Sequence, residues 1–363
     1  MKIVFGHQIF SVQKYGGISR YFYELARNIE KISDNDVEIF APLYINEYLV
    51  KIKPKGFKVP IPENMGQLVT RFNTLASKLL IHSRNDINIY HETYYSGNNN
   101  YPKSAINIVT VFDMVHEKFP SMFSKNDKTK QNKINAINRA DHVICISRNT
   151  QKDLIELLGI DEEKTSVVHL ANSLIIKSSN IPYPNFDAQY ILFVGKRSGY
   201  KNFKNLIKAY ADSKTLKNHF LIVCFGGGKF SNEEINFITS MKIDIRNIKH
   251  IEGDDNMLSY LYSSAAVFIY PSFYEGFGIP PLEAMFHGCP VVCSNTSSIP
   301  EVVGESGIFF NPYEPEEISN AIEQVVSSVD TAKKLVESGF ERSKEFTWEK
   351  CAKKTLSIYE NFK

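Results

Sequence analysis

Short apolar, β-prone segments alternate with helix-like segments along most of this chain of 363 residues, and the alternation constrains the fold more than any other feature. Strands that alternate with helices form parallel sheets with helices on their faces, so the sequence predicts the α/β class. In the first half, helices are expected after Gly17, after Asp127 and from Arg148 to Leu158. The predicted strands there are KIVFG (2–6), VEIFAP (37–42), INIYHE (87–92), AINIVTVFD (105–113), HVICIS (142–147) and TSVVHL (165–170).

A second alternating series follows an aperiodic segment, residues 174–189, which is rich in Pro, Ser and Asn. From Glu314 onward nearly all of the chain is predicted to be helical, and Thr347 is expected to begin the last helix. A chain of this length suggests roughly two domains. We therefore predict domains at 1–175 and 190–345, a linker at 176–189 and a separate final helix at 346–363.

The composition excludes several classes of protein. The formal net charge of +2 gives no general attraction for nucleic acid. No apolar run approaches the roughly 20 residues of a membrane span. The start, MKIVFGHQIF, is too short and too soon polar for a signal peptide, and it predicts a first β-strand. Five cysteines without a regular framework indicate a reducing compartment, so we expect a cytoplasmic protein.

The stretch EGFGIPPLE, from Glu275 to Glu283, has the features of a ligand site between two predicted buried strands. Its glycines form a loop, and Pro280 and Pro281 predict the first turn of a helix. Such a loop directs backbone N–H groups toward a ligand above the sheet, and a diphosphate fits there. The two carboxylates would repel a diphosphate and are better suited to bind hydroxyls beside it. The stretch therefore predicts a nucleotide-sugar site.

The same stretch, within PSFYEGFGIPPLEAMFHGCPVV, resembles the signature of retaining glycosyltransferases of family 4, group 1 type, which have the GT-B fold. The resemblance implies two Rossmann-like domains with parallel sheets that face each other across a cleft, and a C-terminal helix that crosses back to the N-terminal domain. It also implies that the N-terminal domain binds the acceptor and the C-terminal domain the donor. The residues that match the motif are Glu275, Gly276, Phe277, Gly278, Pro281, Glu283 and Ala284.

The resemblance assigns roles in donor binding to this stretch. Glu283 is expected to bind the ribose hydroxyls, and Glu275 the hydroxyls of the transferred sugar. The backbone amides of Phe277, Gly278 and Ile279 are expected to donate hydrogen bonds to the diphosphate.

Two cations follow the first predicted strand of the second domain, at the strand end where ligands of open α/β sheets bind. Arg197 and Lys201 are expected to neutralise the diphosphate and the charge that develops as it leaves. Members of the family place Arg directly after Gly195, where this chain has Lys196, so Lys196 is expected to share or replace the role of Arg197.

In the first domain, Gly16 and Gly17 are placed between the first strand and its helix. A tight turn requires glycine there, and the resemblance adds that these glycines let the donor phosphate and the acceptor approach. Arg20, one turn later, is a weaker candidate for a phosphate or acceptor contact. Asp113 and His116 follow another buried strand. Many relatives have His immediately before the Asp, where this chain has Phe112, and so His116 is the candidate for the sugar contact, with Asp113 to orient it or bind an acceptor hydroxyl.

Other polar segments support more limited interpretations. The glycine-rich CFGGGK (224–229) lacks the pattern of a nucleotide-binding P-loop and is expected to end a strand and let the base approach. HIEGD (250–254) resembles the family segment whose backbone contacts the base. The histidines at positions 7, 91 and 169 have no metal-binding spacing and are interpreted as structural.

The Asp34-Asn35-Asp36 sequence fits the Asp-x-Asp string of the competing GT-A fold, which depends on a divalent metal. It lies between a predicted helix and strand, and a polar turn explains it better. Because Arg197 and Lys201 already supply positive charge, no metal and no cofactor is expected besides the nucleotide sugar as co-substrate.

The amphipathic stretch LVTRFNTLASKLLIH (68–82) and the lysines at 51, 53, 55 and 58 are compatible with a membrane-binding surface. Basic and apolar surfaces can attach an enzyme to the inner face of the cytoplasmic membrane, where lipid-linked acceptors lie. A solvated loop and an ordinary core-facing helix explain the same residues and are favoured.

Together these features predict a metal-independent, retaining hexosyltransferase that moves a sugar from a nucleoside diphosphate to a hydroxyl of a glycan or lipid-linked acceptor. The family often serves bacterial surface polysaccharide, lipopolysaccharide or O-antigen assembly. Two alternatives stay open: a nucleotide-sugar epimerase on a related scaffold, and a catalytically silent protein that binds a nucleotide or glycan.

Overall fold

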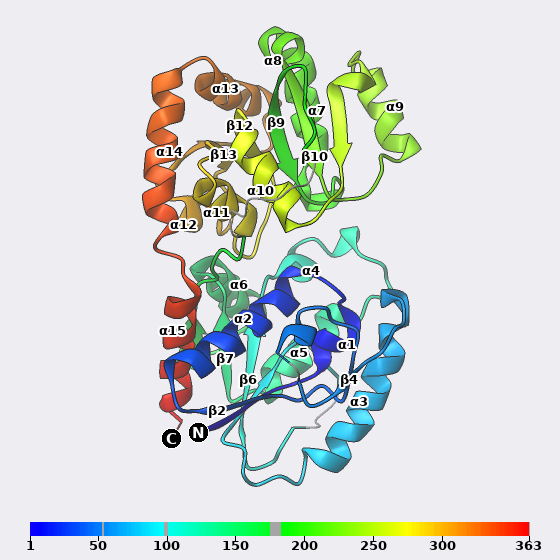
Figure 1. Cartoon of the computed structure of the whole chain (residues 1–363), viewed down its shortest axis with the longest axis vertical. Coiled ribbons are helices and arrows are strands. Elements are labelled where there is room, and N and C mark those ends of the chain that lie inside the picture. Colours follow the sequence, from blue (N-terminus) through cyan, green and yellow to red (C-terminus); the bar gives the residue numbers. More distant parts are fainter. Residues whose placement is uncertain (53, 98–100, 175–182, 363) are drawn as a thin grey trace. The chain divides into compact units, whose positions relative to one another are not determined.

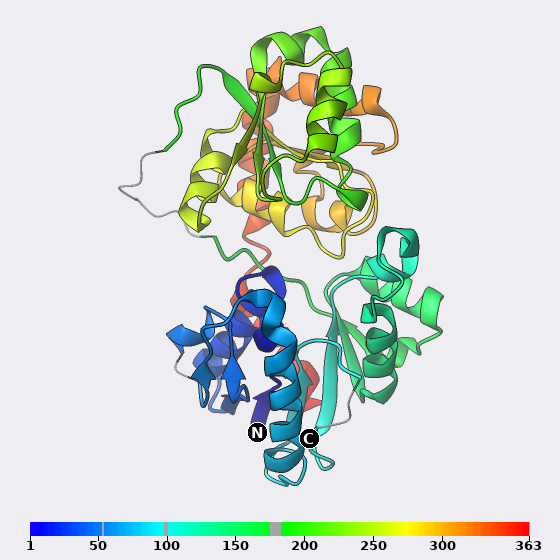
Figure 2. The same cartoon turned by 90° about the vertical axis from the view of Figure 1, so that its right-hand side faces the viewer.

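The computed structural model describes residues 1–52, 54–97, 101–174 and 183–362, and the chain divides into two compact units (Figures 1 and 2). One unit contains Met1–Leu170 together with Thr347–Lys363, and the other contains Ala171–Phe346. Residues 176–182 of the predicted linker lie outside the described part of the chain.

Within the described residues, the first unit has a six-stranded parallel sheet with the order β2-β1-β5-β6-β7-β8. Its strands are β1 (Lys2–Phe5), β2 (Asp36–Ile39), β5 (Ile89–Glu92), β6 (Ile106–Val111), β7 (His142–Cys145) and β8 (Thr165–Val167), and β3 (Leu43–Tyr44) and β4 (Phe57–Lys58) form a separate pair. Its helices are α1 (Gln8–Val12), α2 (Gly17–Ile32), α3 (Gly66–Leu80), α4 (Val115–Lys118), α5 (Thr129–Arg139), α6 (Arg148–Leu158) and α15 (Trp348–Glu360).

The predicted first strand is confirmed, but a short helix that was not predicted follows it. Strand β1 ends at Phe5, and the short helix α1 follows at Gln8. Gly16 and Gly17 therefore join α1 to α2 and do not lie in a strand-to-helix turn. Ile9 and Phe10, which come after the predicted strand, are buried as residues of α1.

The last helix, α15, belongs to the first unit and lies beside α2, as the red and blue helices of Figure 1 show. Thr347 is its N-cap and accepts a hydrogen bond from the backbone N–H of Lys350, as the sequence predicted. The Tyr359 hydroxyl of α15 lies 2.6 Å from His91 Nδ1, and His91 Nε2 lies 2.8 Å from the Thr110 hydroxyl. His91 is thus structural, as expected.

The second unit also has a six-stranded parallel sheet in its described residues, with the order β11-β10-β9-β12-β13-β14. Its strands are β9 (Gln189–Val194), β10 (Phe220–Phe225), β11 (Ile248–Ile251), β12 (Val267–Tyr270), β13 (Val291–Ser294) and β14 (Gly307–Phe310). Its helices are α7 (Phe203–Asp212), α8 (Lys214–His219), α9 (Asn232–Ser240), α10 (Asp255–Ser264), α11 (Ile279–Phe286), α12 (Ile299–Val303), α13 (Pro315–Val326) and α14 (Val329–Ser343).

The strand order of each unit identifies where a ligand should bind. Numbered along the chain, the strands of the second unit have the order 3-2-1-4-5-6, which reverses direction between β9 and β12. In the first unit the order reverses between β1 and β5. Ligands of open parallel sheets bind beyond the carboxyl ends of the strands at such reversals. A ligand is therefore expected at the loops after β9 and β12, or at those after β1 and β5.

Candidate functional site

Lys201 and Glu275 meet at the strand-order reversal of the second unit. Lys201 ends a 3₁₀ turn in the loop after β9, and Glu275 lies in the loop after β12. The Lys201 ammonium is 2.7 Å from Glu275 Oε1 and 3.3 Å from the Tyr270 hydroxyl. Burial, and secondarily the Glu275 charge, raises the pKa of Tyr270, so this tyrosine stays protonated. A cation and a carboxylate that are both largely shielded from water are thus held at the expected ligand position.

Two serines that were not predicted as site residues hold the loop from Glu275 to Gly278, called here the glycine loop. It is distinct from the glycine-rich loop at residues 224–229. The Ser298 hydroxyl, which is fully buried, lies 2.8 Å from the carbonyl oxygens of both Glu275 and Phe277. The Glu275 backbone N–H donates to the Ser297 hydroxyl at 2.9 Å, and Ser297 has a φ of 53°. Both serines follow the carboxyl end of β13, a position that could have indicated them. They fix the backbone that positions the Glu275 side chain.

Helix α11 begins where the sequence predicted, directly after the glycine loop. Gly278 is its N-cap with a φ of 118°, a conformation that glycine adopts readily, and Ile279 is its first residue. Pro280 and Pro281 follow and have no backbone N–H to donate. The segment Gly276–Ile279 thus lies at the helix N-terminus, and the contact of its amides with a diphosphate stays a prediction.

Glu283 lies one turn further along α11 and is buried. The Tyr262 hydroxyl donates to Glu283 Oε2 at 3.1 Å. Burial raises the pKa of Tyr262 well above its ordinary value, and the Glu283 charge adds to the effect. The sequence predicted the carboxylate but not its tyrosine partner. The contact of Glu283 with a ribose stays a prediction.

Arg197 has a different environment from the one expected. Its side chain is only 2% exposed and points into the glycine-rich loop, where it donates to the carbonyl oxygens of Gly226 and Gly228 at 3.0 and 2.8 Å. Its Nε lies 2.8 Å from Glu234 Oε1, and the guanidinium stacks over the Phe230 ring at 4.4 Å. In the structure Arg197 therefore holds this loop, and its role as a phosphate ligand stays a prediction.

The glycine-rich loop owes its shape to its glycines. Gly226, Gly227 and Gly228 all have φ between 74° and 79°, and a side chain on Gly227 would come within 2.9 Å of the Gly195 carbonyl oxygen. This turn presents its carbonyl groups to Arg197. Lys196, by contrast, is exposed. Of the two adjacent cations, Lys196 is the one that a ligand can reach without breaking existing bonds.

A cavity of about 730 Å³ lies beside these cations, between the loop after β9, the glycine-rich loop and α9. Lys196, Phe237 and Phe273 are among its lining residues, and Lys201, Glu275 and Glu283 are not. This cavity therefore contains only part of the predicted donor residues of the second unit.

In the first unit, the two predicted glycines have unequal surroundings. A side chain on Gly16 would overlap the Gln13 amide, and Gln13 in turn accepts a hydrogen bond from the Ser19 backbone N–H. Around Gly17 there is open space, so a ligand can approach its backbone. Arg20 donates to the Tyr48 hydroxyl at 3.0 and 2.9 Å, which fixes its side chain.

Asp113 and His116 do not form the expected pair. Asp113 accepts a hydrogen bond from the Val115 backbone N–H at 3.1 Å, in the turn that leads into α4. The ring of His116 stacks on Phe123 at 3.9 Å, and its Nε2 lies 3.5 Å from Asp127. Among the described residues no hydrogen bond joins the two side chains, so the idea that Asp113 orients His116 is wrong. The carboxylate that orients His116 is Asp127.

The Asp-x-Asp string lies away from the ligand edge. Asp36 begins β2, and its carboxylate is 3.0 Å from the Lys2 ammonium at the amino end of the sheet. Asn35 accepts a hydrogen bond from the N-terminal ammonium. These contacts agree with a polar turn that secures the chain terminus.

Comparisons with known proteins agree with this architecture. Residues 15–171 match the family model described as Glycosyltransferase Family 4, and residues 177–342 match that of Glycosyl transferases group 1. O-antigen chain mannosyltransferase B of Escherichia coli is 26% identical over 99% of both chains. O-antigen chain mannosyltransferase RfbU of Salmonella typhimurium is 28% identical over 60% of both.

A solved structure with the same fold is sucrose-phosphate synthase from Thermosynechococcus elongatus, with a TM-score of 0.75, 18% identity and coverage of 99% of this chain and 98% of that chain. The two family models divide the chain in the order of its two units, and the fold matches over the full length. The chain belongs to the family 4, group 1 glycosyltransferases and has their GT-B fold.

Proposed function

We propose that this glycosyltransferase transfers a mannosyl residue from a nucleoside diphosphate mannose to a hydroxyl of a glycan or lipid-linked acceptor during assembly of a bacterial surface polysaccharide such as O-antigen. The choice of mannose and of O-antigen rests on the names of the two relatives. The observation that carries donor binding is the Lys201–Glu275 pair at the strand-order reversal.

In this proposal the cations and the carboxylates bind different parts of the donor. Lys201, together with the exposed Lys196, neutralises the diphosphate as it leaves. Glu275 binds hydroxyls of the transferred sugar, and Glu283 binds those of the ribose. Since lysines supply the positive charge, we propose that no divalent metal is needed.

We further propose retention of configuration at the anomeric carbon. In such a front-face reaction the leaving phosphate accepts the proton of the acceptor hydroxyl, so that no separate side chain has to serve as the base. The residues at the reversal then need only to bind, orient and neutralise.

A donor panel in EDTA tests the proposal. Purified protein is mixed with UDP-, GDP-, dTDP- and ADP-sugars, mannose donors included, and thermal stabilisation and nucleotide release are measured. Selective stabilisation by a mannose donor, weakened in Glu275→Gln, is the expected result. A response that appears only with a divalent ion would overturn the metal-independent part. Release of a free epimerised sugar nucleotide would favour the epimerase. Donor binding without turnover, even when an acceptor is present, would favour the catalytically silent protein.

We also propose that helix α3 places the enzyme on an anionic membrane surface that carries the acceptor. The favoured expectation of a core-facing apolar stripe is wrong: Leu68, Phe72, Leu75 and Leu79 are all more than half exposed. The face that α3 buries contains instead Val69, Asn73 and Ser77. Figure 2, in which α3 faces the viewer, shows the helix on the outside of its unit.

Positive charge on α3 favours anionic lipid as the surface that the exposed apolar stripe contacts. Arg71 and Lys78 are exposed on the same helix. Of the lysines weighed earlier, Lys58 is paired with Glu47 at 2.7 Å, and Lys53 lies outside the described residues. An exposed apolar stripe flanked by cations binds anionic bilayers. No helix in the described part of the chain is both long and apolar enough to cross a membrane. Flotation with anionic vesicles tests surface binding.

A further inference from the structure

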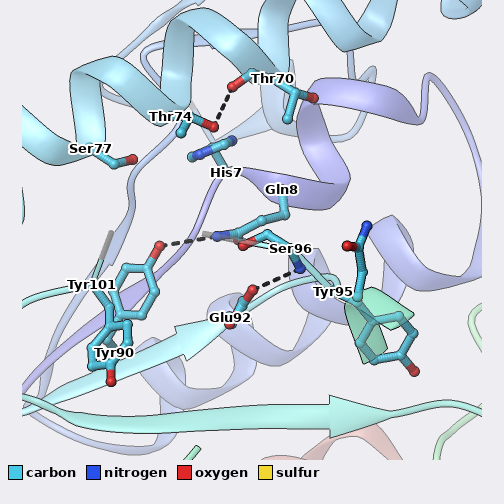
Figure 3. A pocket seen from close by; sticks show the side chains of 12 residues that line it. His7, Gln8, Thr70, Thr74, Ser77, Tyr90, Glu92, Tyr95, Ser96 and Tyr101 are labelled. Carbon is cyan, nitrogen blue, oxygen red and sulfur yellow. Dashed lines mark hydrogen bonds between the residues drawn. The ribbon is translucent and has the colours of Figure 1, made fainter. Parts of the chain in front are cut away.

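The first unit contains a cavity of about 220 Å³ at its own strand-order reversal (Figure 3). His7 and Gln8 line it from the end of β1, and Glu92, Tyr95 and Ser96 from the end of β5. One face of α3 covers it with the hydroxyl residues Thr70, Thr74 and Ser77, spaced four and three residues apart. This position is the one at which an open parallel sheet binds ligands.

The polar wall of the cavity is fixed by hydrogen bonds. Gln8 Oε1 accepts from the backbone N–H and the hydroxyl of Thr93 at 3.2 and 3.1 Å, and Gln8 Nε2 donates to the Tyr90 hydroxyl at 3.3 Å. Gly6 makes this arrangement possible, because a side chain there would come within 2.2 Å of Gln8 Oε1. The wall is therefore preorganised, which reduces the cost of binding.

Among the described residues that line the cavity, none carries an unpaired charge. Glu92 is ion-paired with Arg139, and its Oε1 also accepts from the Ser96 backbone N–H at 3.0 Å. Burial lowers the pKa of His7 to about 4, so its ring is neutral near pH 7. His7 had been interpreted as structural only, and it is also a wall of the cavity. A phosphate or carboxylate would find no cation here that is not already paired with Glu92, so the lining selects an uncharged ligand.

Ser77 provides the observation that points to a ligand. Its side chain is 1% exposed and lines the cavity, yet its hydroxyl has no hydrogen-bond partner in the described residues. Buried polar groups without a partner are rare and costly in folded proteins. Tyr90 and Tyr101 line the same cavity, and their rings stack with centroids 6.4 Å apart. A polyhydroxylated ring would satisfy the hydroxyl and pack its carbons on the tyrosines.

We propose that this cavity binds an uncharged sugar ring of the acceptor and selects it through Ser77, Thr74 and the Gln8–Tyr90 wall. That the bound sugar belongs to the acceptor rests on the proposed transferase function. Sugar binding by the first unit does not depend on that function. In this proposal Ser77 determines specificity for the acceptor and has no part in binding the donor.

Ligand-observed saturation-transfer NMR with methyl α-D-mannopyranoside and mannose 6-phosphate tests the proposal directly. Wild type is expected to bind the neutral glycoside and to discriminate against the phosphate. Ser77→Ala removes one hydrogen bond to the ligand and none to a described residue of the protein, so we expect about three- to tenfold weaker binding with an unchanged melting temperature. Thr74→Phe fills the cavity from a half-buried position and should abolish binding.

Ser259→Ala is the matched control, because Ser259 is another buried serine whose hydroxyl has no partner in the described residues, in α10 of the second unit. It should leave glycoside binding unchanged. Unaltered binding by folded Ser77→Ala and Thr74→Phe, equal binding of mannose 6-phosphate, or no binding by wild type would each overturn the proposal. Donor stabilisation is recorded in parallel. If it is absent while glycoside binding persists, the transferase proposal fails and the sugar site stands.

Discussion

The Lys201 ammonium lies 2.7 Å from Glu275 Oε1 and so joins the loop after β9 to the loop after β12. On the proposed donor site, a diphosphate at this point would compete with Glu275 for the ammonium. The released carboxylate would then be free to accept hydrogen bonds from sugar hydroxyls. We therefore propose that the pair couples neutralisation of the phosphates to binding of the sugar.

Substitutions of the pair should show this coupling in transfer rates. We expect Lys201→Met and Glu275→Gln each to lower kcat/KM by roughly 10²–10³, the range found when a charge-stabilising group is removed. Because the two groups act together, the double variant should lose much less than the product of the single losses. Fully multiplicative losses, in variants with normal thermal unfolding, would show that the residues act independently.

Ser298 should matter through the shape of the glycine loop. Ser298→Ala leaves the carbonyl groups of Glu275 and Phe277 without this donor, and we expect destabilisation of about 1–3 kcal/mol with weaker donor binding. Urea unfolding and donor titration measure the two effects. The control is Ser327→Ala, a serine whose hydroxyl donates to the Glu323 carbonyl oxygen at the end of α13. Equal effects of both substitutions would contradict the role of Ser298.

Arg197 and Lys196 should separate loop stability from donor binding. Arg197→Lys loses the planar set of donors that holds Gly226, Gly228 and Glu234, so we expect a lower thermal midpoint. Lys196→Ala should leave that midpoint unchanged and raise the KM for the donor. If instead Arg197→Lys keeps its stability and loses donor binding, the guanidinium acts on the phosphates directly.

The outcome for Arg197 shows what the sequence could predict about this site. Strand positions, the start of α11 and the cap at Thr347 follow from local patterns, and those predictions were correct. The residues at the ligand edge could also be predicted, because they directly follow the predicted strands. Contacts between loops that are distant in the sequence could not be predicted. Arg197 contacts a loop about 30 residues away, and Ser298 contacts one more than 20 residues away.

The orientation of α3 was predicted wrongly for another reason. Its apolar residues have helical spacing, and helical spacing predicts an apolar face without stating whether that face is inside. The opposite face carries Asn73, which donates to the Leu43 carbonyl oxygen and to the Ser11 hydroxyl at 2.6 and 2.9 Å. These hydrogen bonds turn the polar face inward, and only tertiary structure shows them.

Stability should fall in mild acid because His7 is buried in its neutral form. Burial lowers the pKa of His7 from 6.5 to about 4, so between these values the unfolded chain binds a proton that the folded chain does not. Stability is therefore full above pH 6.5 and decreases as the pH falls toward 4. At pH 5 the loss from this group is roughly 2 kcal/mol. Urea midpoints at pH 7.5 and 5 measure it. His7→Gln should reduce the difference between them, and the exposed His219→Gln should not.

The α3 stripe should control attachment to membranes without affecting the chemistry. Phe72→Glu and Leu75→Glu place charge on the exposed stripe, and we expect each to lower partitioning onto anionic vesicles by about tenfold or more. Val329→Glu, at a valine 84% exposed on α14, is the matched control and should bind vesicles as wild type does. Transfer to a soluble acceptor should be unchanged in all three variants, whereas transfer to a lipid-linked acceptor in vesicles should fall only in the α3 variants. Vesicle binding that is insensitive to both α3 substitutions would show that this helix does not contact the bilayer.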